Sequence, residues 1–194
     1  MEKRLLITGF DGFGGDSLNP SSMAVAKLPE QIGNFVLCKL SIPTRFGEAA
    51  RCVLDAAADF HPDLILCVGL AGGRDAVTPE RIAVNIRDAR IPDNGGFQPK
   101  GQRVDPQGPA AYFSTVPVEK MAEAIRAAGI PATVSNSAGA FVCNDVLYTL
   151  LHHYRDTAVQ VGFIHVPRIP ELGSPSLPLE TIVRALTAAI AACE

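Results

Sequence analysis

Cys143 is the residue of this chain best placed to act as a nucleophile. It stands in SNSAGAFVCNDVLYTLLHHY, where small residues follow an apolar segment and precede apolar residues at helical spacing. This pattern places Cys143 at or near the start of a helix, where the helix dipole and free N–H groups favour the nucleophilic thiolate. The strand–turn–helix order resembles a nucleophile elbow, although G-x-S-x-G is absent. Because cysteines in such places are commonly structural, a catalytic role requires a nearby base.

Elimination selects His165 as that base. The chain has four histidines. His61 lies at a turn in FHPD, and His152 and His153 lie two to three turns along the helix that Cys143 begins. His165 ends the apolar strand VGFIHVP, and a parallel sheet places that end at the same edge as the start of the Cys143 helix. The alternative is a buried histidine with a structural role.

A carboxylate is needed to orient the imidazole and to stabilise it when charged. Glu80 is attractive because it stands where a glycine-rich turn meets a strand, in GGRDAVTPERIAVNI. Composition and spacing do not select it over Asp75, Asp88 or Asp145. The residues alone therefore leave the third position open.

Composition limits the class of protein. The 194 residues are 47% hydrophobic and 19% charged, as expected for a single globular domain spanning 1–194. The net charge is −3 and no basic run occurs, which disfavours a nucleic-acid partner. No apolar run approaches the ~20 residues of a membrane span, and the N-terminus is not typical of a signal peptide. We therefore expect a cytoplasmic protein with no membrane partner.

The cysteines indicate free thiols. There are five, at scattered positions without a C-x-x-C pair or zinc-like spacing, so no metal site is expected. An odd number without a disulfide framework is typical of a reducing compartment. Four of the five have ordinary interpretations as small packed residues or as a terminal residue: Cys38, Cys52, Cys67 and Cys193.

Strands and helices are predicted to alternate along the chain. The predicted strands are 4–8, 35–40, 64–68, 132–135 and 159–166. The predicted helices are 21–28, capped by Asn19-Pro20, then 47–60, 118–128, 144–154 and 179–192. Such alternation favours an α/β fold with a mostly parallel twisted sheet covered by helices on both faces.

Two segments depart from this alternation of strands and helices. Residues 81–87 alternate apolar Ile82, Val84 and Ile86 with mostly polar neighbours, which predicts a half-exposed strand. Residues 88–116 are rich in Gly, Pro, Asn and Gln, and form either a functional loop or a surface insertion.

The glycine-rich turn TGFDGFGG follows the first strand but fits neither a dinucleotide fingerprint nor a P-loop. Phe10 and Phe13 interrupt its glycines. They either pack into the core or form an apolar wall beside a pocket at the carboxyl end of the sheet.

Five segments of the chain form a recognisable set. They are TGFDGFGG with NPS, around Phe10–Ser21; GLAGGRDAVTPERIAVN, Gly69–Asn85; DARIPDN, Asp88–Asn94; SNSAGAFVCN, Ser135–Asn144; and GFIHVP, Gly162–Pro167. In this order they resemble the pyroglutamyl peptidase type I family, also called pyrrolidone-carboxylate peptidases. The resemblance covers nearly the whole chain. It implies a three-layer α/β/α sandwich and no metal or organic cofactor.

The resemblance also implies roles for individual residues. Cys143 would be the nucleophile, His165 the base and Glu80 the third member of a triad. Arg90 would stabilise the oxyanion with the Cys143 amide, and the main chain at Leu70 would bond the ring amide. The pocket for the pyrrolidone ring would include Phe10, Phe13, Thr44, Ile91, Phe141 and Val142.

The implied activity is hydrolysis of the amide bond after an N-terminal pyroglutamyl (5-oxoprolyl) residue, through a thioester. Pyroglutamate carries no N-terminal charge, so its site should be an apolar slot with one hydrogen-bond donor and one acceptor. Two other classes stay open: a non-catalytic metabolite-binding or redox-sensing protein, and a phosphorylase-like nucleoside enzyme. The sequence does not decide between monomer and homo-oligomer, dimer or tetramer.

Overall fold

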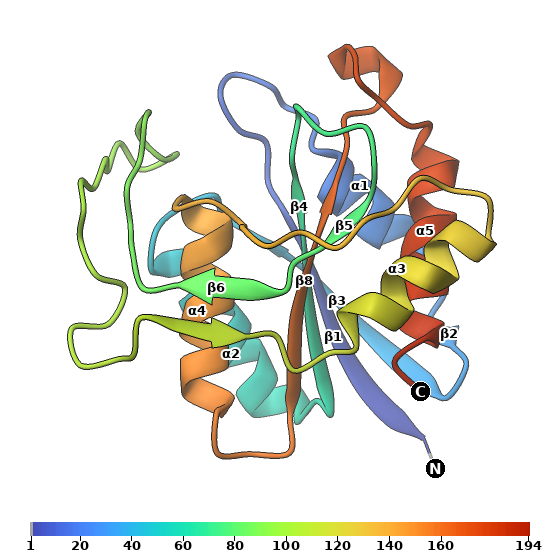
Figure 1. Ribbon diagram of the computed structural model, residues 1–194, viewed down its shortest axis with the longest axis horizontal. Coiled ribbons are helices and arrows are strands. Elements are labelled where there is room, and N and C mark those ends of the chain that lie inside the picture. Colours follow the sequence, from blue (N-terminus) through green and yellow to red (C-terminus); the bar gives the residue numbers. More distant parts are fainter. Residues whose placement is uncertain (1) are drawn as a thin grey trace.

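A six-stranded sheet runs through the centre of the computed structural model, which describes residues 2–194 (Figure 1). The strand order is β2-β3-β1-β4-β8-β5. The four inner strands are parallel, and the short edge strands β2 and β5 are antiparallel to their neighbours. The strands are β1 (Lys3–Phe10), β2 (Gln31–Ile32), β3 (Phe35–Ile42), β4 (Leu64–Leu70), β5 (Thr78–Pro79) and β8 (Gln160–Val166).

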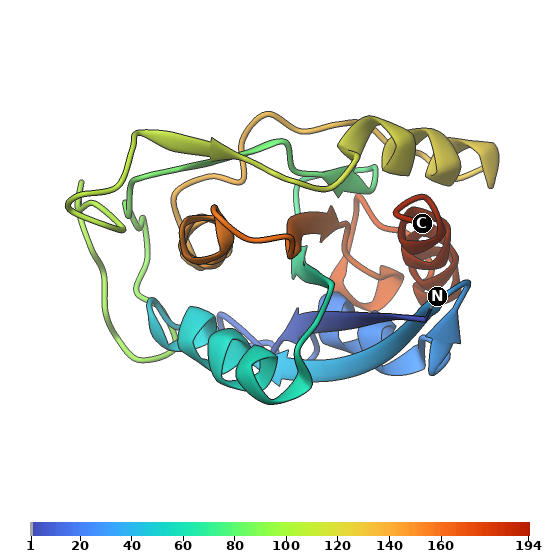
Figure 2. The same ribbon diagram turned by 90° about the horizontal axis from the view of Figure 1, so that it is seen from below.

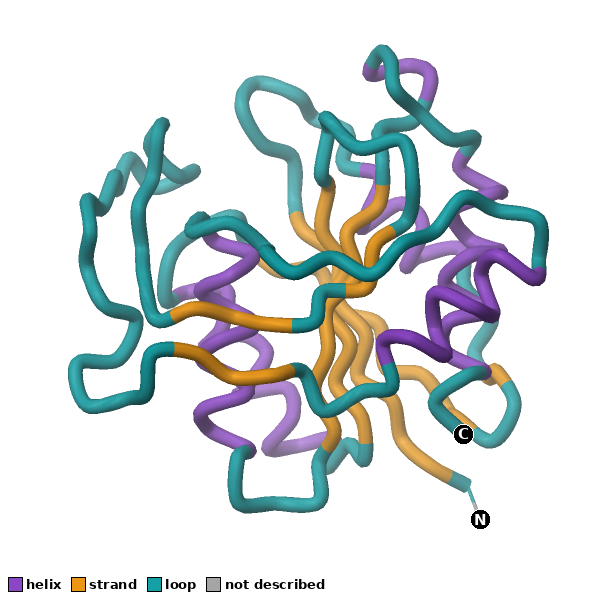
Figure 3. The backbone as a smooth tube through the Cα atoms, viewed as in Figure 1, coloured by secondary structure: helices purple, strands orange, loops and turns teal. Residues whose placement is uncertain are grey.

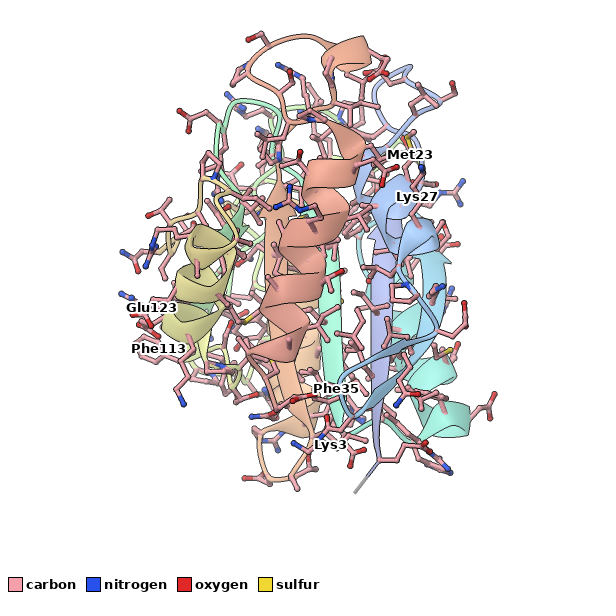
Figure 4. The ribbon with its side chains drawn as sticks, turned by 90° about the vertical axis from the view of Figure 1, so that its right-hand side faces the viewer. Lys3, Met23, Lys27, Phe35, Phe113 and Glu123 are labelled. Carbon is pink, nitrogen blue, oxygen red and sulfur yellow. The ribbon has the colours of Figure 1, made fainter. Side chains whose placement is uncertain are left out.

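Five α-helices cover both faces of this sheet (Figure 2). One face packs against α2 (Glu48–Phe60) and α4 (Val142–Tyr154), and the other against α1 (Pro20–Lys27), α3 (Val118–Ala127) and α5 (Leu179–Ala191). In Figure 4, α5 lies between α3 and the helix that carries Met23 and Lys27. Each face has its own core of buried apolar side chains. The predicted α/β/α sandwich is therefore confirmed, and each predicted helix is present within one or two residues.

Helix α1 begins with a side-chain cap. The Asn19 side chain accepts a hydrogen bond from the Ser21 amide (3.0 Å), and Pro20 is the first helical residue of α1, as predicted. Helix α4 begins at Val142, two residues earlier than the apolar spacing suggests. Cys143 consequently lies in the first turn of α4.

The predicted strand over residues 132–135 is wrong. These residues run parallel to the segment 77–81 but form only isolated bridges to it. Hydrogen bonds alternate between the two segments at Val77 and at Ser135, as in a parallel ladder. Pro79 interrupts this ladder because it has no N–H to donate. A proline on the neighbouring segment thus limits the pairing of residues 132–135. The apolar sequence of these residues gives no sign of that proline.

A separate two-stranded ribbon lies beside α4. Its strands are β6 (Ile82–Val84) and β7 (Ala111–Phe113), which are antiparallel. The predicted half-exposed strand is confirmed, but Ala83 is the buried residue and Ile86 is exposed. The opposite face of the alternation is therefore the buried one, and Ala83 belongs to the same core cluster as the apolar residues of α4.

Long connections gather at the carboxyl ends of the parallel strands (Figure 3). They include the segments 11–18, 71–77 and 167–178 after β1, β4 and β8. This edge is where open α/β sheets bind ligands. Among residues 2–194, no helix combines the length and apolar character needed to cross a membrane.

Candidate active site

The Cys143 thiol lies over β4 at the carboxyl edge of the sheet. A Cβ placed on Gly69 would be 3.0 Å from Cys143 Sγ and 2.8 Å from the Phe163 ring, so glycine leaves room for the thiol. Gly69 pairs with His165 on β8. His165 also shares a sheet face with Phe163, which packs in the core beneath α4. The fold therefore brings the thiol and the imidazole to adjacent strands on one face.

Glu80 lies on the other side of His165. Glu80 Oε1 and His165 Nδ1 are 2.7 Å apart, and both side chains are buried. The main chain fixes this contact, because the Glu80 amide donates to Phe163 O (2.9 Å) on β8. The structure thus places Glu80, of the four candidate acids, against the imidazole of His165.

The competing acids have other surroundings. Asp145 is paired with Arg87 Nε (2.5 Å), and Asp88 lies 3.6 Å from Lys100 Nζ. Asp75 is exposed. Among residues 2–194, Glu80 is the acid within hydrogen-bond distance of His165.

The electrostatics of the pair leave Glu80 charged and His165 neutral. Burial raises the pKa of Glu80, but His165, Ser135 and Arg74 outweigh it and hold that pKa below its usual range. Burial lowers the pKa of His165 more than its contact with Glu80 raises it. An ionised carboxylate can only accept a hydrogen bond, so Nδ1 carries the proton and Nε2 is free to take one.

Burial has the opposite consequence for the thiol. It raises the pKa of Cys143 to about 12, and the Glu80 charge acts in the same direction. The backbone N–H of Cys143 at the helix start does lower this pKa, but desolvation outweighs it, so the net pKa is raised. Near neutral pH the thiol of Cys143 is therefore protonated, and the His165 imidazole is neutral.

Two polar residues after Cys143 fix the start of α4. The Asn144 side chain accepts from the Val84 amide (2.9 Å) and donates to the carbonyls of Val84 (2.8 Å) and Ile86 (3.1 Å). Asp145 accepts from the Gly47 amide (2.8 Å) in addition to its bond with Arg87. Both Asn144 and Asp145 are fully buried. They tie α4 to β6 and to α2, and so hold Cys143 in place.

A small apolar cavity adjoins the thiol. Its volume is about 140 Å³. This is well below the roughly 300–1,000 Å³ of sites for drug-sized ligands, so it suits one small ring. Its walls hold five predicted pocket residues together with Cys143 and Asn19: Phe10, Phe13, Thr44, Leu70 and Phe141. The Phe13 and Phe141 rings are 5.3 Å apart between centroids.

A second cavity lies behind Phe13 and Phe141, which line both. It measures about 330 Å³ and is lined by Arg90 and Ile91. The structure therefore does not bring Ile91, whose side chain is 52% exposed, into the cavity that holds Cys143. Val142 is fully buried in the core beneath α4 and lines neither cavity.

Side-chain hydrogen bonds brace the loop that carries Phe13. Asp11 Oδ1 accepts from the Thr44 amide and hydroxyl, both at 2.8 Å, and from the Asn94 side chain (3.2 Å). Asn94 also donates to Gly12 O (2.7 Å). The first loop, the end of β3 and the DARIPDN segment are thereby joined around the cavity.

Comparison with known proteins agrees with this geometry. A family model for pyroglutamyl peptidase matches residues 3–194. The chain belongs to the pyroglutamyl peptidase family. The pyrrolidone-carboxylate peptidase of Levilactobacillus brevis is 52% identical over 197 residues, which cover 97% of this chain and 96% of that protein.

Solved structures are similar over the same extent. Pyroglutamyl peptidase I of Bacillus amyloliquefaciens has a TM-score of 0.96 and 42% identity, covering 99% of this chain and 97% of that one. Pyrrolidone carboxyl peptidase of Thermococcus litoralis has a TM-score of 0.94 and 38% identity, covering 98% and 93%. The chain is thus a cysteine peptidase of the pyroglutamyl peptidase family.

Sequence reasoning missed two residues at this pyroglutamyl peptidase site. Asn19 lines the small cavity, although its sequence signal was only that of a helix cap. Arg74 is bonded to Glu80 (2.6 Å). A signal for Arg74 was its position in GGRD, in the turn that follows a strand ending at the ligand-binding edge.

Proposed function

We propose that this chain hydrolyses the amide bond after an N-terminal pyroglutamyl residue, with Cys143 as nucleophile, His165 as base and Glu80 as the residue that orients His165. The observation that carries the proposal is the placement of a buried Glu80–His165 pair beside a thiol that faces a small apolar cavity. We also propose that residues 1–194 form one catalytic domain, because the residues of this site come from segments along the chain from β1 to β8.

The size and apolar walls of the small cavity support a pyroglutamyl ring as its ligand. A pyroglutamyl ring is flat, small and uncharged, with one amide N–H and one carbonyl. The Phe10, Phe13 and Phe141 side chains supply apolar walls, and none of the residues that line the cavity is acidic. Main-chain groups at Leu70 are suited to bond the lactam. A charged N-terminal ammonium would find no carboxylate there.

The proposed reaction starts from a neutral Cys143 thiol and a neutral His165 imidazole. As Cys143 Sγ bonds to the pyroglutamyl carbonyl carbon, its proton passes to His165 Nε2. The C–N bond then breaks, and His165 gives the proton to the leaving amine. Water, deprotonated by His165, attacks the thioester and releases pyroglutamate. Glu80 stabilises the imidazolium at each stage.

The oxyanion is best stabilised from the start of α4. First-turn N–H groups have no intrahelical acceptors, and that of Cys143 lies next to its own sulfur. Arg90 is proposed as a second donor. It is exposed in the second cavity, so it would have to reach past Phe13 and Phe141 to the reacting carbonyl.

The proposed partners are peptides that begin with pyroglutamate, in a reducing compartment such as the cytoplasm. All five cysteines are free, and a thiol nucleophile requires that Cys143 stays reduced. The thiol and the cavity are contained in one chain, so the proposal does not require a homo-oligomer.

The direct test is release of a fluorescent amine from a pyroglutamyl arylamide. We expect turnover without added phosphate, and we expect alkylation of the thiols to abolish it. Stoichiometric labelling of Cys143 in a protein without turnover would instead indicate a binding or redox-sensing role. A requirement for phosphate would indicate phosphorylase chemistry.

Replacement Glu80→Gln should reduce kcat, but about tenfold to hundredfold less severely than loss of Cys143. The carboxylate orients and stabilises the imidazole without transferring a proton itself. Because the Glu80 charge raises the pKa of His165, the acid limb of the pH profile should also move to lower pH. The pH dependence of kcat/KM measures both effects. Wild-type values in Glu80→Gln would remove Glu80 from the mechanism.

Replacement Phe13→Ala should raise KM for the pyroglutamyl substrate about tenfold while kcat changes little. Phe13 is a half-buried wall of the cavity, and loss of one apolar contact of this size costs roughly 1–2 kcal/mol. The matched control is Phe113→Ala, because Phe113 is 68% exposed on β7. Steady-state kinetics of the two variants decide the matter; an unchanged KM in Phe13→Ala would exclude this cavity as the ring site.

A further inference from the structure

Arg74 connects two parts of the site that are distant in sequence. It lies in the segment between β4 and β5. Its Nη1 donates to Glu80 Oε1 (2.6 Å) and to the Thr78 hydroxyl, and its Nη2 donates to Ser137 O (3.0 Å). Ser137 belongs to the loop that leads into α4 and Cys143. One guanidinium therefore contacts both the acid of the triad and the loop before the nucleophile.

The Glu80 carboxylate needs such a partner. It is fully buried, and its Oε1 is shared between His165 Nδ1 (2.7 Å) and Arg74. Its Oε2 accepts no hydrogen bond of normal geometry from residues 2–194, although Ser135 is near enough to affect the pKa of Glu80. A buried carboxylate beside a neutral imidazole leaves an uncompensated charge, which is costly. Arg74 supplies the compensating cation.

We propose that Arg74 is a positioning residue of the active site, whose guanidinium holds Glu80 against His165 and fixes both relative to the loop that carries Cys143. The inference rests on the proposed function. It assigns no contact with substrate to Arg74, which does not line the small cavity.

The charge of Arg74 gives this role a distinctive pH signature. The groups that act on the His165 imidazole are Glu80 after β5 and Arg74 before it, while the thiols of Cys67 on β4 and Cys143 on α4 are uncharged near neutral pH. Burial is the largest effect on His165 and lowers its pKa; the Arg74 charge lowers it further. Without Arg74, the pKa of His165 should rise, because Glu80 then attracts the imidazolium unopposed.

Three variants test the proposal. Arg74→Gln removes the charge, and Arg74→Lys keeps the charge but loses the forked contact with Glu80 and Ser137. Arg81→Gln is the matched control. Arg81 follows Glu80 and bonds Asn136 of the same loop (3.1 Å) and Glu119 (2.7 Å), but does not contact the Glu80 side chain.

Each variant is assayed with a pyroglutamyl arylamide across pH, and the His165 ring is titrated by NMR. In Arg74→Gln we expect kcat to fall on the order of 10²-fold with KM little changed. We also expect its acid limb and the His165 titration to move to higher pH. Arg74→Lys should restore the wild-type limb and only part of kcat, and Arg81→Gln should match wild type.

Other results overturn the proposal. Wild-type kcat in Arg74→Gln would do so, as would equal losses in both Arg74 variants with an unmoved His165 titration, which would indicate a merely structural role. If Arg74→Gln does not fold, an acid limb moved to higher pH in Arg74→Lys would equally contradict the charge argument. An inactive wild type with the expected titration shift would count against the proposed function and leave the Arg74 contact supported.

Discussion

Replacement Cys143→Ser should lower kcat/KM for a pyroglutamyl arylamide by on the order of 10⁴-fold or more. Cys143 is half-buried in the first turn of α4, and its thiol lies over Gly69. A serine side chain is only slightly smaller than a cysteine side chain. The fold should therefore persist while the nucleophile is lost. A serine hydroxyl is far less acidic than a thiol, and the same burial that raises the thiol pKa also disfavours an alkoxide at this position.

The measurement is steady-state kinetics beside a thermal melt and the control Cys52→Ser. Cys52 is a half-buried free thiol on α2, away from the small cavity. We expect Cys52→Ser to keep wild-type activity and both variants to melt near the wild type. Substantial turnover by Cys143→Ser would assign the nucleophile elsewhere.

Replacement His165→Ala should be nearly as damaging as Cys143→Ser. The thiol is protonated at rest, so attack without a base must begin from a group whose pKa is raised to about 12. Residual activity in His165→Ala should therefore increase steadily with pH, because only the rare thiolate reacts. The wild type should instead reach a plateau, with an acid limb below the usual histidine range because burial lowers the pKa of His165.

The control for this experiment is His153→Ala, an exposed residue near the end of α4. It should retain the wild-type pH profile. A His165→Ala variant with the wild-type profile, or an equal loss in His153→Ala, would show that the base has been assigned wrongly.

The positions of Cys143 and His165 could be predicted from the sequence because both residues lie at the ends of predicted helices or strands. Cys143 follows a small-residue turn before a helical pattern, and His165 ends an apolar strand, so parallel-sheet geometry brings them to one edge. The buried faces of helices follow from apolar spacing in the same way. The thiol pKa did not follow from its helix position, because burial depends on the packing of Phe163, Gly69 and the rest of the core around it.

The contacts of Glu80 and Arg74 required the three-dimensional structure, although the family resemblance already implied a role for Glu80. Glu80 lies 85 residues from His165 in the sequence, and the pairing of β5 with β8 brings the two together. By spacing alone, several other acids were equally plausible. Arg74 donates a hydrogen bond to the carbonyl of Ser137, which is 63 residues away in the chain. The incorrect strand prediction for residues 132–135 also reflects a contact that is distant in sequence, because Pro79 on the neighbouring segment interrupts the ladder of hydrogen bonds.

The most direct test of substrate recognition is the ratio of kcat/KM for pyroglutamyl and prolyl arylamides at equal concentration and pH. A prolyl ring has a charged nitrogen and no ring carbonyl, so it would leave the polar groups of the site unpaired within apolar walls. Sites built to bond such groups reject analogues lacking them by about 10⁴-fold or more. We expect a preference of that order for the pyroglutamyl substrate. Comparable values for the two substrates would contradict the assignment of the cavity to the lactam, whatever the role of Cys143.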